Sequence, residues 1–326
     1  MKFRGYFSFI CLCLFPILVF SQPSGDTNYP NKPIRIIIPQ SPGSATDTLI
    51  RLMAPKLTEQ LGAPIILDNR LGAGGIIGAE AVAKAMPDGY TLLVGATSWM
   101  TIAPHVYPKL NYDPLKDLAP ISIFAIGQNV LAVSASSPYL TLKDLVTQMK
   151  DHPNSFNMAS AGIGSTSHMA GVMLTSITGS TAVHVPYKGA GPSVMSVLSG
   201  ESQWVFTPMQ GPIALIRSGK LRALAIGGNV RSAILPDVPT IKEGGFPAYD
   251  LRNWYGLLAP AGTPKAIIDK LNTAIVKISK LPEIKEQFYG QGSEPISNSP
   301  AEFSHFMKDE TERMAVIVKT AGIKVE

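Results

Sequence analysis

Cysteine is almost absent from this sequence: its 326 residues contain two, Cys11 and Cys13, both close to the N-terminus. If the first segment is removed on export, the mature chain has none. Such a chain cannot form a disulfide, present a thiolate nucleophile or bind a metal through cysteine. It suits an oxidising compartment, because no thiol can mispair.

Long apolar runs are also scarce, and the one that stands out opens the chain. A positively charged start precedes an uncharged run from Tyr6 to Phe20, and the small residues Val19 and Ser21 occupy positions −3 and −1 of a cleavage site. This pattern is typical of a secretory signal peptide, here residues 1–21. The run is shorter than the roughly 20 residues that a membrane anchor needs. We therefore expect a periplasmic mature protein.

Strong charge of either sign is missing. Lys and Arg number 28 and Asp and Glu 23, a formal charge of +5 that falls to +3 without the signal peptide. No Lys/Arg tract is present, so we expect no nucleic-acid partner. The histidines have no ligand-pair spacing, so we expect no metal and no other cofactor. They are His105, His152, His168, His184 and His305.

Strands and helices alternate through most of the chain. The β-branched run Ile34–Ile38 predicts a strand, and a helical pattern capped by Thr46 or Asp47 follows, with Pro55 expected to kink or shorten it. The strand–helix–strand order predicts α/β units with parallel strands. Further strands are predicted near residues 65–67, 91–95, 130–133, 156–159, 183–185, 204–206, 223–226 and 255–258, and the last helices at 264–280, 283–289 and 300–321.

The glycine-rich stretch Gly72-Ala73-Gly74-Gly75 invites comparison with a dinucleotide-binding loop. Its spacing does not fit, because the third glycine of G-x-G-x-x-G would fall at Ile77. We interpret the stretch as a tight turn followed by closely packed helix.

Many short motifs, in order along the mature chain, together resemble one family. They include Tyr29-Pro30-Asn31-Lys32-Pro33, Pro42-Gly43 with Thr46-Asp47, Asp68-Asn69-Arg70, Pro87-Asp88-Gly89-Tyr90, Ser160-Ala161-Gly162 with Gly164-Ser165 and His168, His184-Val185-Pro186-Tyr187-Lys188-Gly189, Leu235-Pro236-Asp237-Val238-Pro239 and Trp254-Tyr255-Gly256-Leu257. The sequence is similar to the substrate-binding proteins of tripartite tricarboxylate transporters, common in Bordetella-like bacteria. The resemblance implies a type II periplasmic binding protein: two α/β lobes joined by two crossing strands, with a ligand cleft between them.

The resemblance also implies the domain organisation and the function. Residues 22–126 and 250–326 would form lobe 1, and residues 127–249 lobe 2. The protein would be a monomer without enzymatic activity. It would close on a small organic carboxylate and deliver it to membrane transporter subunits of the tripartite tricarboxylate type. A membrane sensor could read the same closed form, and the sequence does not separate these outputs.

Two polar loops are the candidate binding elements, because each joins the end of a strand to the start of a helix. Ligands of open α/β sheets bind there, and helix starts favour anions. The family implies that both loops hold a carboxylate. The predicted ligand-binding residues are Pro42, Gly43, Ser44, Ala45, Thr46 and Asp47 in the first loop, Ala161, Gly162, Gly164, Ser165, Thr166 and His168 in the second, and Thr97, Ser98, Tyr187, Lys188 and Thr207 after other strands.

Some of these residues have other interpretations. Asp47 has a second interpretation as a simple helix cap, and Lys188 as a solvated surface residue rather than the partner of a second carboxylate. Ser165 and His168, with Asp47, suggest an exported serine hydrolase, although the sequence has no G-x-S-x-G elbow. Many relatives carry an acid near Thr207. Its replacement here suggests a ligand without an amine.

Overall fold

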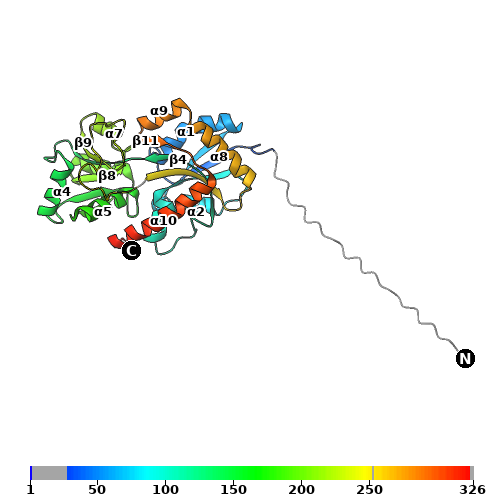
Figure 1. The fold of residues 1–326 in the computed structure, drawn as a ribbon, viewed down its shortest axis with the longest axis horizontal. Coiled ribbons are helices and arrows are strands. Elements are labelled where there is room, and N and C mark those ends of the chain that lie inside the picture. Colours follow the sequence, from blue (N-terminus) through cyan, green and yellow to red (C-terminus); the bar gives the residue numbers. More distant parts are fainter. Residues whose placement is uncertain (2–27, 252, 324–326) are drawn as a thin grey trace.

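The computed structural model describes residue 1, residues 28–251 and residues 253–323. Met1 apart, the predicted signal peptide lies outside the described residues. The chain builds two β-sheets flanked by helices, and each sheet belongs to one lobe (Figure 1). The six-stranded sheet has the order β11-β4-β10-β3-β1-β2, and the five-stranded sheet has the order β7-β6-β8-β5-β9. The predicted α/β fold class is confirmed.

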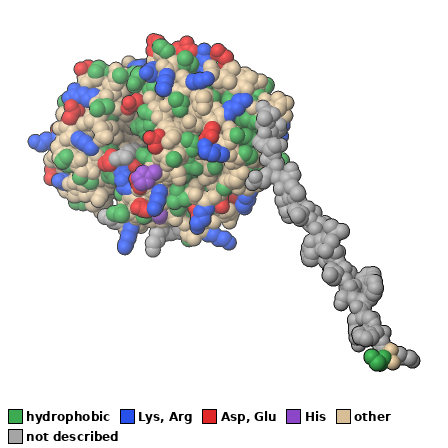
Figure 2. Space-filling model, turned by 45° about the vertical axis from the view of Figure 1, so that its right-hand side comes forward, with side chains coloured by type: hydrophobic (Ala, Val, Ile, Leu, Met, Phe, Trp, Pro, Cys, Tyr) green, Lys and Arg blue, Asp and Glu red, His purple; other side chains and the backbone are tan. Residues whose placement is uncertain are grey.

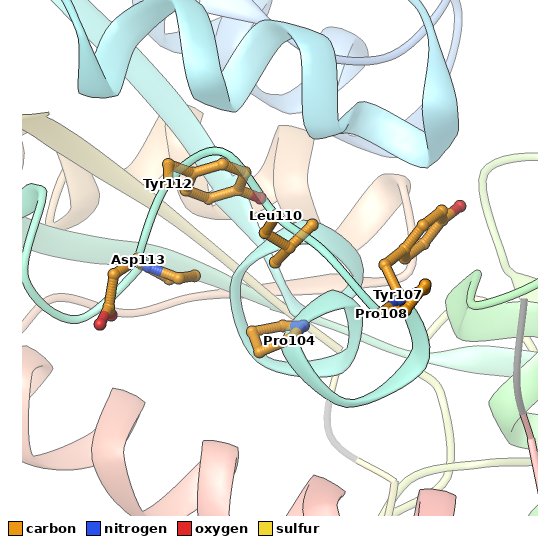
Figure 3. Close-up of a pocket in the computed structure, with 7 residues that line it drawn as sticks. Pro104, Tyr107, Pro108, Leu110, Tyr112 and Asp113 are labelled. Atoms are coloured by element: carbon orange, nitrogen blue, oxygen red, sulfur yellow. The ribbon is translucent and has the colours of Figure 1, made fainter.

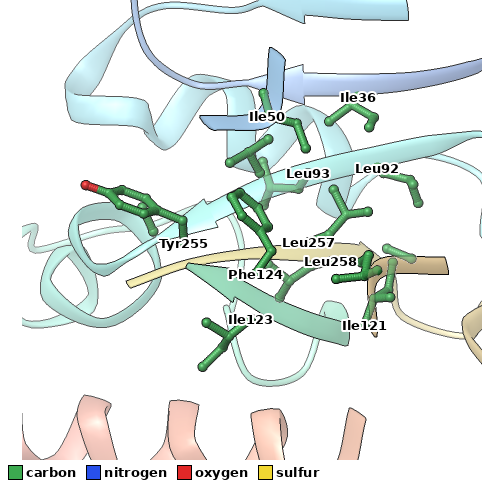
Figure 4. Close-up of a cluster of buried hydrophobic side chains, with 14 of the residues drawn as sticks. Ile36, Ile50, Leu92, Leu93, Ile121, Ile123, Phe124, Tyr255, Leu257 and Leu258 are labelled. Carbon is green, nitrogen blue, oxygen red and sulfur yellow. The ribbon is translucent and has the colours of Figure 1, made fainter. Parts of the chain in front are cut away.

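The six-stranded lobe combines the start and the end of the chain. Its first strand runs parallel to its two neighbours, and β10 runs antiparallel to β3 and β4. Apolar side chains of four strands and of α1 meet in one core, which includes Ile36, Ile50, Leu93, Phe124 and Leu257 (Figure 4). Its elements are β1 (Ile34–Ile38), α1 (Ala45–Leu61), β2 (Ile65–Asn69), η1 (Ala73–Gly75), α2 (Ile76–Ala83), β3 (Thr91–Ala96), η2 (Ser98–Ile102), α3 (Ala103–Val106), β4 (Leu118–Gly127), β10 (Asn253–Pro260), α8 (Lys265–Ser279), α9 (Pro282–Gly290), β11 (Ser293–Pro295) and α10 (Pro300–Ala321).

The five-stranded lobe comes from the middle of the chain. Its strand β6 runs parallel to β7 and β8, whereas β5 runs antiparallel to β8 and β9. Its elements are β5 (Asn129–Ser134), α4 (Leu142–Asp151), β6 (Asn157–Ser160), α5 (Thr166–Thr178), β7 (Val183–Pro186), α6 (Ala190–Ser199), β8 (Trp204–Pro208), α7 (Ile213–Arg217) and β9 (Leu221–Ile226).

The two lobes are joined by two crossings of the chain and by one long helix. Strand β4 ends at Gly127 in one sheet and β5 begins at Asn129 in the other, so the first crossing is direct. The chain returns to the first sheet at β10. Helix α10 then runs beneath both lobes (Figure 1): Met307 packs in the core of the six-stranded lobe and Met314 in that of the five-stranded lobe.

The structure corrects the expected shortening of α1 at Pro55 and the expected cap of that helix. Pro55 does not shorten α1, which continues to Leu61. Because Pro55 is exposed, water can reach the helical carbonyl that its missing N–H leaves without a donor. The cap of α1 is Ser44, not Thr46 or Asp47. The interpretation of the glycine-rich stretch holds, since a Cβ on Gly78 would lie 3.0 Å from a carbonyl oxygen of the preceding loop.

Candidate functional site

The first predicted loop ends in a serine-capped helix start. Ser44 accepts a hydrogen bond from the Asp47 amide at 3.4 Å, and the Gly43 amide donates to the Asp47 carboxylate at 2.9 Å. Gly43 has a φ of +79°, which glycine adopts without strain. The Ala45 and Thr46 amides occupy the first two helical positions, where no intrahelical acceptor exists. These two amides are therefore the donors that this loop can offer to a guest.

Asp47 is buried and held by several donors. Its carboxylate accepts from Arg51 Nε at 2.9 Å and from Asn69 Nδ2 at 3.0 Å, besides the Gly43 amide. Burial alone would raise the pKa of this carboxyl, but the hydrogen bonds and the guanidinium charge outweigh it and lower the pKa. The carboxylate is thus ionised and saturated, which leaves it little capacity to bind a ligand directly.

The second predicted loop repeats the first in a different lobe. Ser165 caps α5 and accepts from the His168 amide at 3.2 Å, and the Gly164 amide donates to His168 Nδ1 at 3.2 Å. Gly164 has a φ of +73°. The Thr166 and Ser167 amides fill the first two helical positions. Both loops therefore present the same arrangement of glycine, capping serine, two helix-start amides and a side-chain acceptor.

Two stacked histidines, His168 and His184, lie next to the second loop. The rings of His168 and His184 stack with centroids 3.8 Å apart, and His184 Nε2 lies 2.6 Å from Ser160 Oγ. Burial, together with the neighbouring His184, lowers the pKa of His168 to about 3. Burial lowers the pKa of His184 to about 4. Both rings are uncharged at neutral pH, and His168 Nδ1 is then free to accept the Gly164 N–H.

The remaining predicted residues fall at the same edges of the sheets. The β6–β7 register ends at the pair Ser160–Pro186, so Ala161 and Tyr187 lie one step beyond it, whereas Thr207 lies inside β8 and pairs with Val130 of β5. Thr207 Oγ1 is buried, and no group in the described parts of the chain lies within hydrogen-bond distance of it. Lys188 is exposed. In the other lobe Thr97 Oγ1 accepts from the Trp254 amide at 3.2 Å, and Ser98 opens the η2 turn.

Sequence reasoning missed Tyr107, which lies where the lobes meet. A Cβ built on Gly164 would lie 3.6 Å from its ring, and one built on Gly74 would lie 3.4 Å from its hydroxyl. Tyr107 also borders a surface pocket of about 270 Å³, in which it points away from Tyr112 and Asp113 (Figure 3). No turn or cap marks this residue in the sequence, because its position depends on the unpredicted η2 and α3.

The hydrolase interpretation has no matching geometry. Ser165 Oγ donates to the Gly162 carbonyl at 2.6 Å and lies 3.0 Å from Ser167 Oγ. The ring of His168 instead accepts the Gly164 amide, and Asp47 belongs to the other loop. A triad requires the nucleophile, the base and the acid in mutual contact.

The described segments lack two other kinds of site. Among residues 28–251 and 253–323 no cluster of three or more His, Cys, Asp or Glu could hold a metal ion. No helix of the described segments is both long and apolar enough to cross a membrane. Lys and Arg are interspersed with Asp and Glu on the face seen in Figure 2.

Comparison with known proteins points to one family. The family described as tripartite tricarboxylate transporter family receptor matches residues 49–323. Protein BugT of Bordetella pertussis is 36% identical over 304 residues, which cover 93% of each chain.

Solved structures agree with this similarity. The structure of R. palustris Rpa4515 with adipate has a TM-score of 0.88 and 31% identity, and the match covers 91% of this chain and all of that one. MatC of Rhodopseudomonas palustris with bound malate has a TM-score of 0.82 and 30% identity, with 89% of this chain and all of that one covered.

Proposed function

Because this chain belongs to the family of tripartite tricarboxylate transporter receptors, we propose that it captures a small organic carboxylate outside the cytoplasmic membrane and delivers it to such a transporter. The family and its fold are those of solute-binding receptors, so the chain is not an enzyme. We also propose that the protein is a monomer exported to the periplasm and that its lobes are divided at residues 126/127 and 249/250. Its proposed partners are membrane transporter subunits.

The observation that carries the proposal is the matched pair of helix starts. Ala45 and Thr46 in one lobe, and Thr166 and Ser167 in the other, offer amides that their helices leave without an acceptor. The positive ends of two helix dipoles add to the attraction for an anion. A carboxylate that contacts both lobes stabilises the closed form over the open one. The relatives with bound adipate and malate support this ligand class.

A ligand screen tests the proposal. Adipate, malate, succinate and citrate would be added to the purified mature protein in a thermal-shift assay, and positive results would be titrated by calorimetry. A ligand at 100 times its Kd stabilises the folded state by about 2.7 kcal/mol, which raises the unfolding midpoint. The absence of any shift at millimolar concentrations across the whole panel would refute the carboxylate receptor.

One substitution removes a single proposed donor. Ala45→Pro deletes the first helix-start amide, and proline is well tolerated there because Ser44 is already extended, with ψ at 166°. We expect affinity to fall about tenfold, the equivalent of one lost charge-assisted hydrogen bond. Lys265→Pro makes the same change at the exposed start of α8 and should leave affinity unchanged. Equal affinities of the two variants would contradict the assignment of this amide.

The second lobe also suggests which carboxylates are preferred. Thr207 is uncharged and the stacked histidines are neutral, so these residues offer no charge partner for a ligand ammonium. We therefore propose a ligand without an amine. Succinate should bind more tightly than aspartate, which has the same chain length, and tighter binding of aspartate in the titration would contradict this preference.

A further inference from the structure

We infer that Asp47 and His168 are equivalent positioning residues, one in each lobe, which fix the two loops in the conformation that turns their helix-start amides toward the ligand. This inference rests on the proposed function and deepens it. It assigns the two side chains a role other than direct contact with the carboxylate.

The equivalence is geometric. Each side chain stands third in its helix and accepts the amide of the glycine four residues before it, at 2.9 Å for Asp47 and 3.2 Å for His168. Each capping serine has nearly the same backbone angles, with φ and ψ of −68° and 166° for Ser44 and −71° and 159° for Ser165. The serine amides make the same turn, each to a carbonyl three residues back at 3.1 Å.

Each acceptor side chain holds the amide of a glycine in the left-handed backbone region. Gly43 and Gly164 have positive φ angles, and their amides would lose their partners if the acceptor side chains were removed. Asp47 is 2% exposed and His168 is 6% exposed, so water cannot easily replace either of them. In each loop a single capping serine separates the glycine from the first helical residue, so a shift of the glycine would also turn the helix-start amides beyond it.

The chemical difference between the acceptors also has a reason. The negative charge of Asp47 is offset by Arg51, whose guanidinium lies 2.8 Å away. His168 accepts as a neutral ring and stacks on the neutral ring of His184. Both loops thus gain an acceptor without presenting an uncompensated negative charge to an incoming carboxylate. An ionised side chain at position 168 would lack the guanidinium that Asp47 has.

Three substitutions at position 168 separate positioning from simple packing. His168→Leu removes the acceptor and should weaken binding of adipate and malate about tenfold. His168→Asn keeps an acceptor oxygen and should restore affinity to within about threefold of the wild type. His168→Asp keeps the acceptor but adds a charge, so its affinity should fall as the pH rises from about 5 to about 8, whereas His168→Asn should show no such dependence. His152→Leu, on the exposed end of α4, is the control for loss of a histidine.

Amide exchange measured by NMR tests the same inference without a ligand. His168→Leu should speed exchange of the Gly164 amide at least about tenfold and leave Gly43 unchanged, because the two loops are held independently. If wild type binds none of the four acids of the ligand screen, the proposed function fails and the amide exchange alone decides the positioning role. Equal Gly164 exchange in wild type and His168→Leu, or equal affinity of the Leu and Asn variants, would overturn the inference.

Discussion

At the scale of single residues, the stacked pair His168 and His184 makes the folded state sensitive to acid. Burial lowers the pKa values to about 3 and about 4, while an unfolded chain binds these protons near pH 6.5. Between these values the unfolded state holds more protons than the folded state. The stabilisation is therefore complete above about pH 6.5 and is lost as the pH falls toward 4.

We expect the variant with both His168→Asn and His184→Gln to lose less stability in acid than the wild type. Each titrating histidine can change the free energy of unfolding by at most about 1.4 kcal/mol per pH unit. Urea denaturation at about pH 7 and about pH 4.5 measures the difference, with the exposed His152→Asn as control. Parallel losses in the double variant and the wild type would show that these rings titrate normally.

The residues of the two loops were predictable to different degrees. The glycine and the strand-to-helix position of each loop could be read from the sequence, because positive φ angles and helix starts depend on neighbouring residues. The capping role of Ser44 was missed, since Thr46 and Asp47 are cap-forming residue types as well. The partners of Asp47 and His168 could not. Asn69 and His184 reach the loops from other strands, 22 residues from Asp47 and 24 residues from Ser160. The repeated Gly-Ser pair, followed three residues after the serine by an acceptor, was the available signal.

At the scale of elements, the contact between the glycine-rich stretch and Trp99 shows why η2 and α3 were not predicted. Gly75 has a φ of +104°, and a Cβ on it would lie 2.4 Å from the ring of Trp99. Trp99 is fully buried in η2, where its Nε1 donates to the Val94 carbonyl. No side chain caps η2 or α3, so the packing of this short stretch against Gly75 depends on tertiary structure.

Substitution of Gly75 tests this contact. Gly75→Ala combines a positive φ with overlap against a rigid indole, and we expect a loss of about 3 kcal/mol or more in the free energy of unfolding. Gly179→Ala, at the end of α5, has a φ of +65° but open space around it, so its loss should be about 1 kcal/mol. Chemical denaturation of both variants isolates the contribution of the contact. A similar loss in both would show that Trp99 can move aside at little cost.

At the scale of the whole molecule, α10 ties the lobes together. Its predicted bounds were correct, because Ser299, Pro300 and Glu302 form a capping box with proline at the helix start. Its contact with both lobes was not predictable, because one continuous apolar face packs first against one core and then against the other. Phe303 and Met307 pack with the six-stranded lobe, and Met314 and Val318 with the five-stranded lobe. The helix therefore connects the two cores independently of the chain crossings.

Truncation of one α10 side chain should weaken this connection. Met314 is fully buried, and Met314→Ala should cost about 2–5 kcal/mol, mostly in the five-stranded lobe. We expect calorimetry to show a lower and broader transition, as that lobe begins to unfold before the other. Val316, two residues further along and 65% exposed, supplies the control, because Val316→Ala should change stability by no more than about 0.5 kcal/mol. If Met314→Ala lowers the midpoint of one unchanged, sharp transition, α10 does not set the coupling between the lobes and the crossing strands alone must carry it.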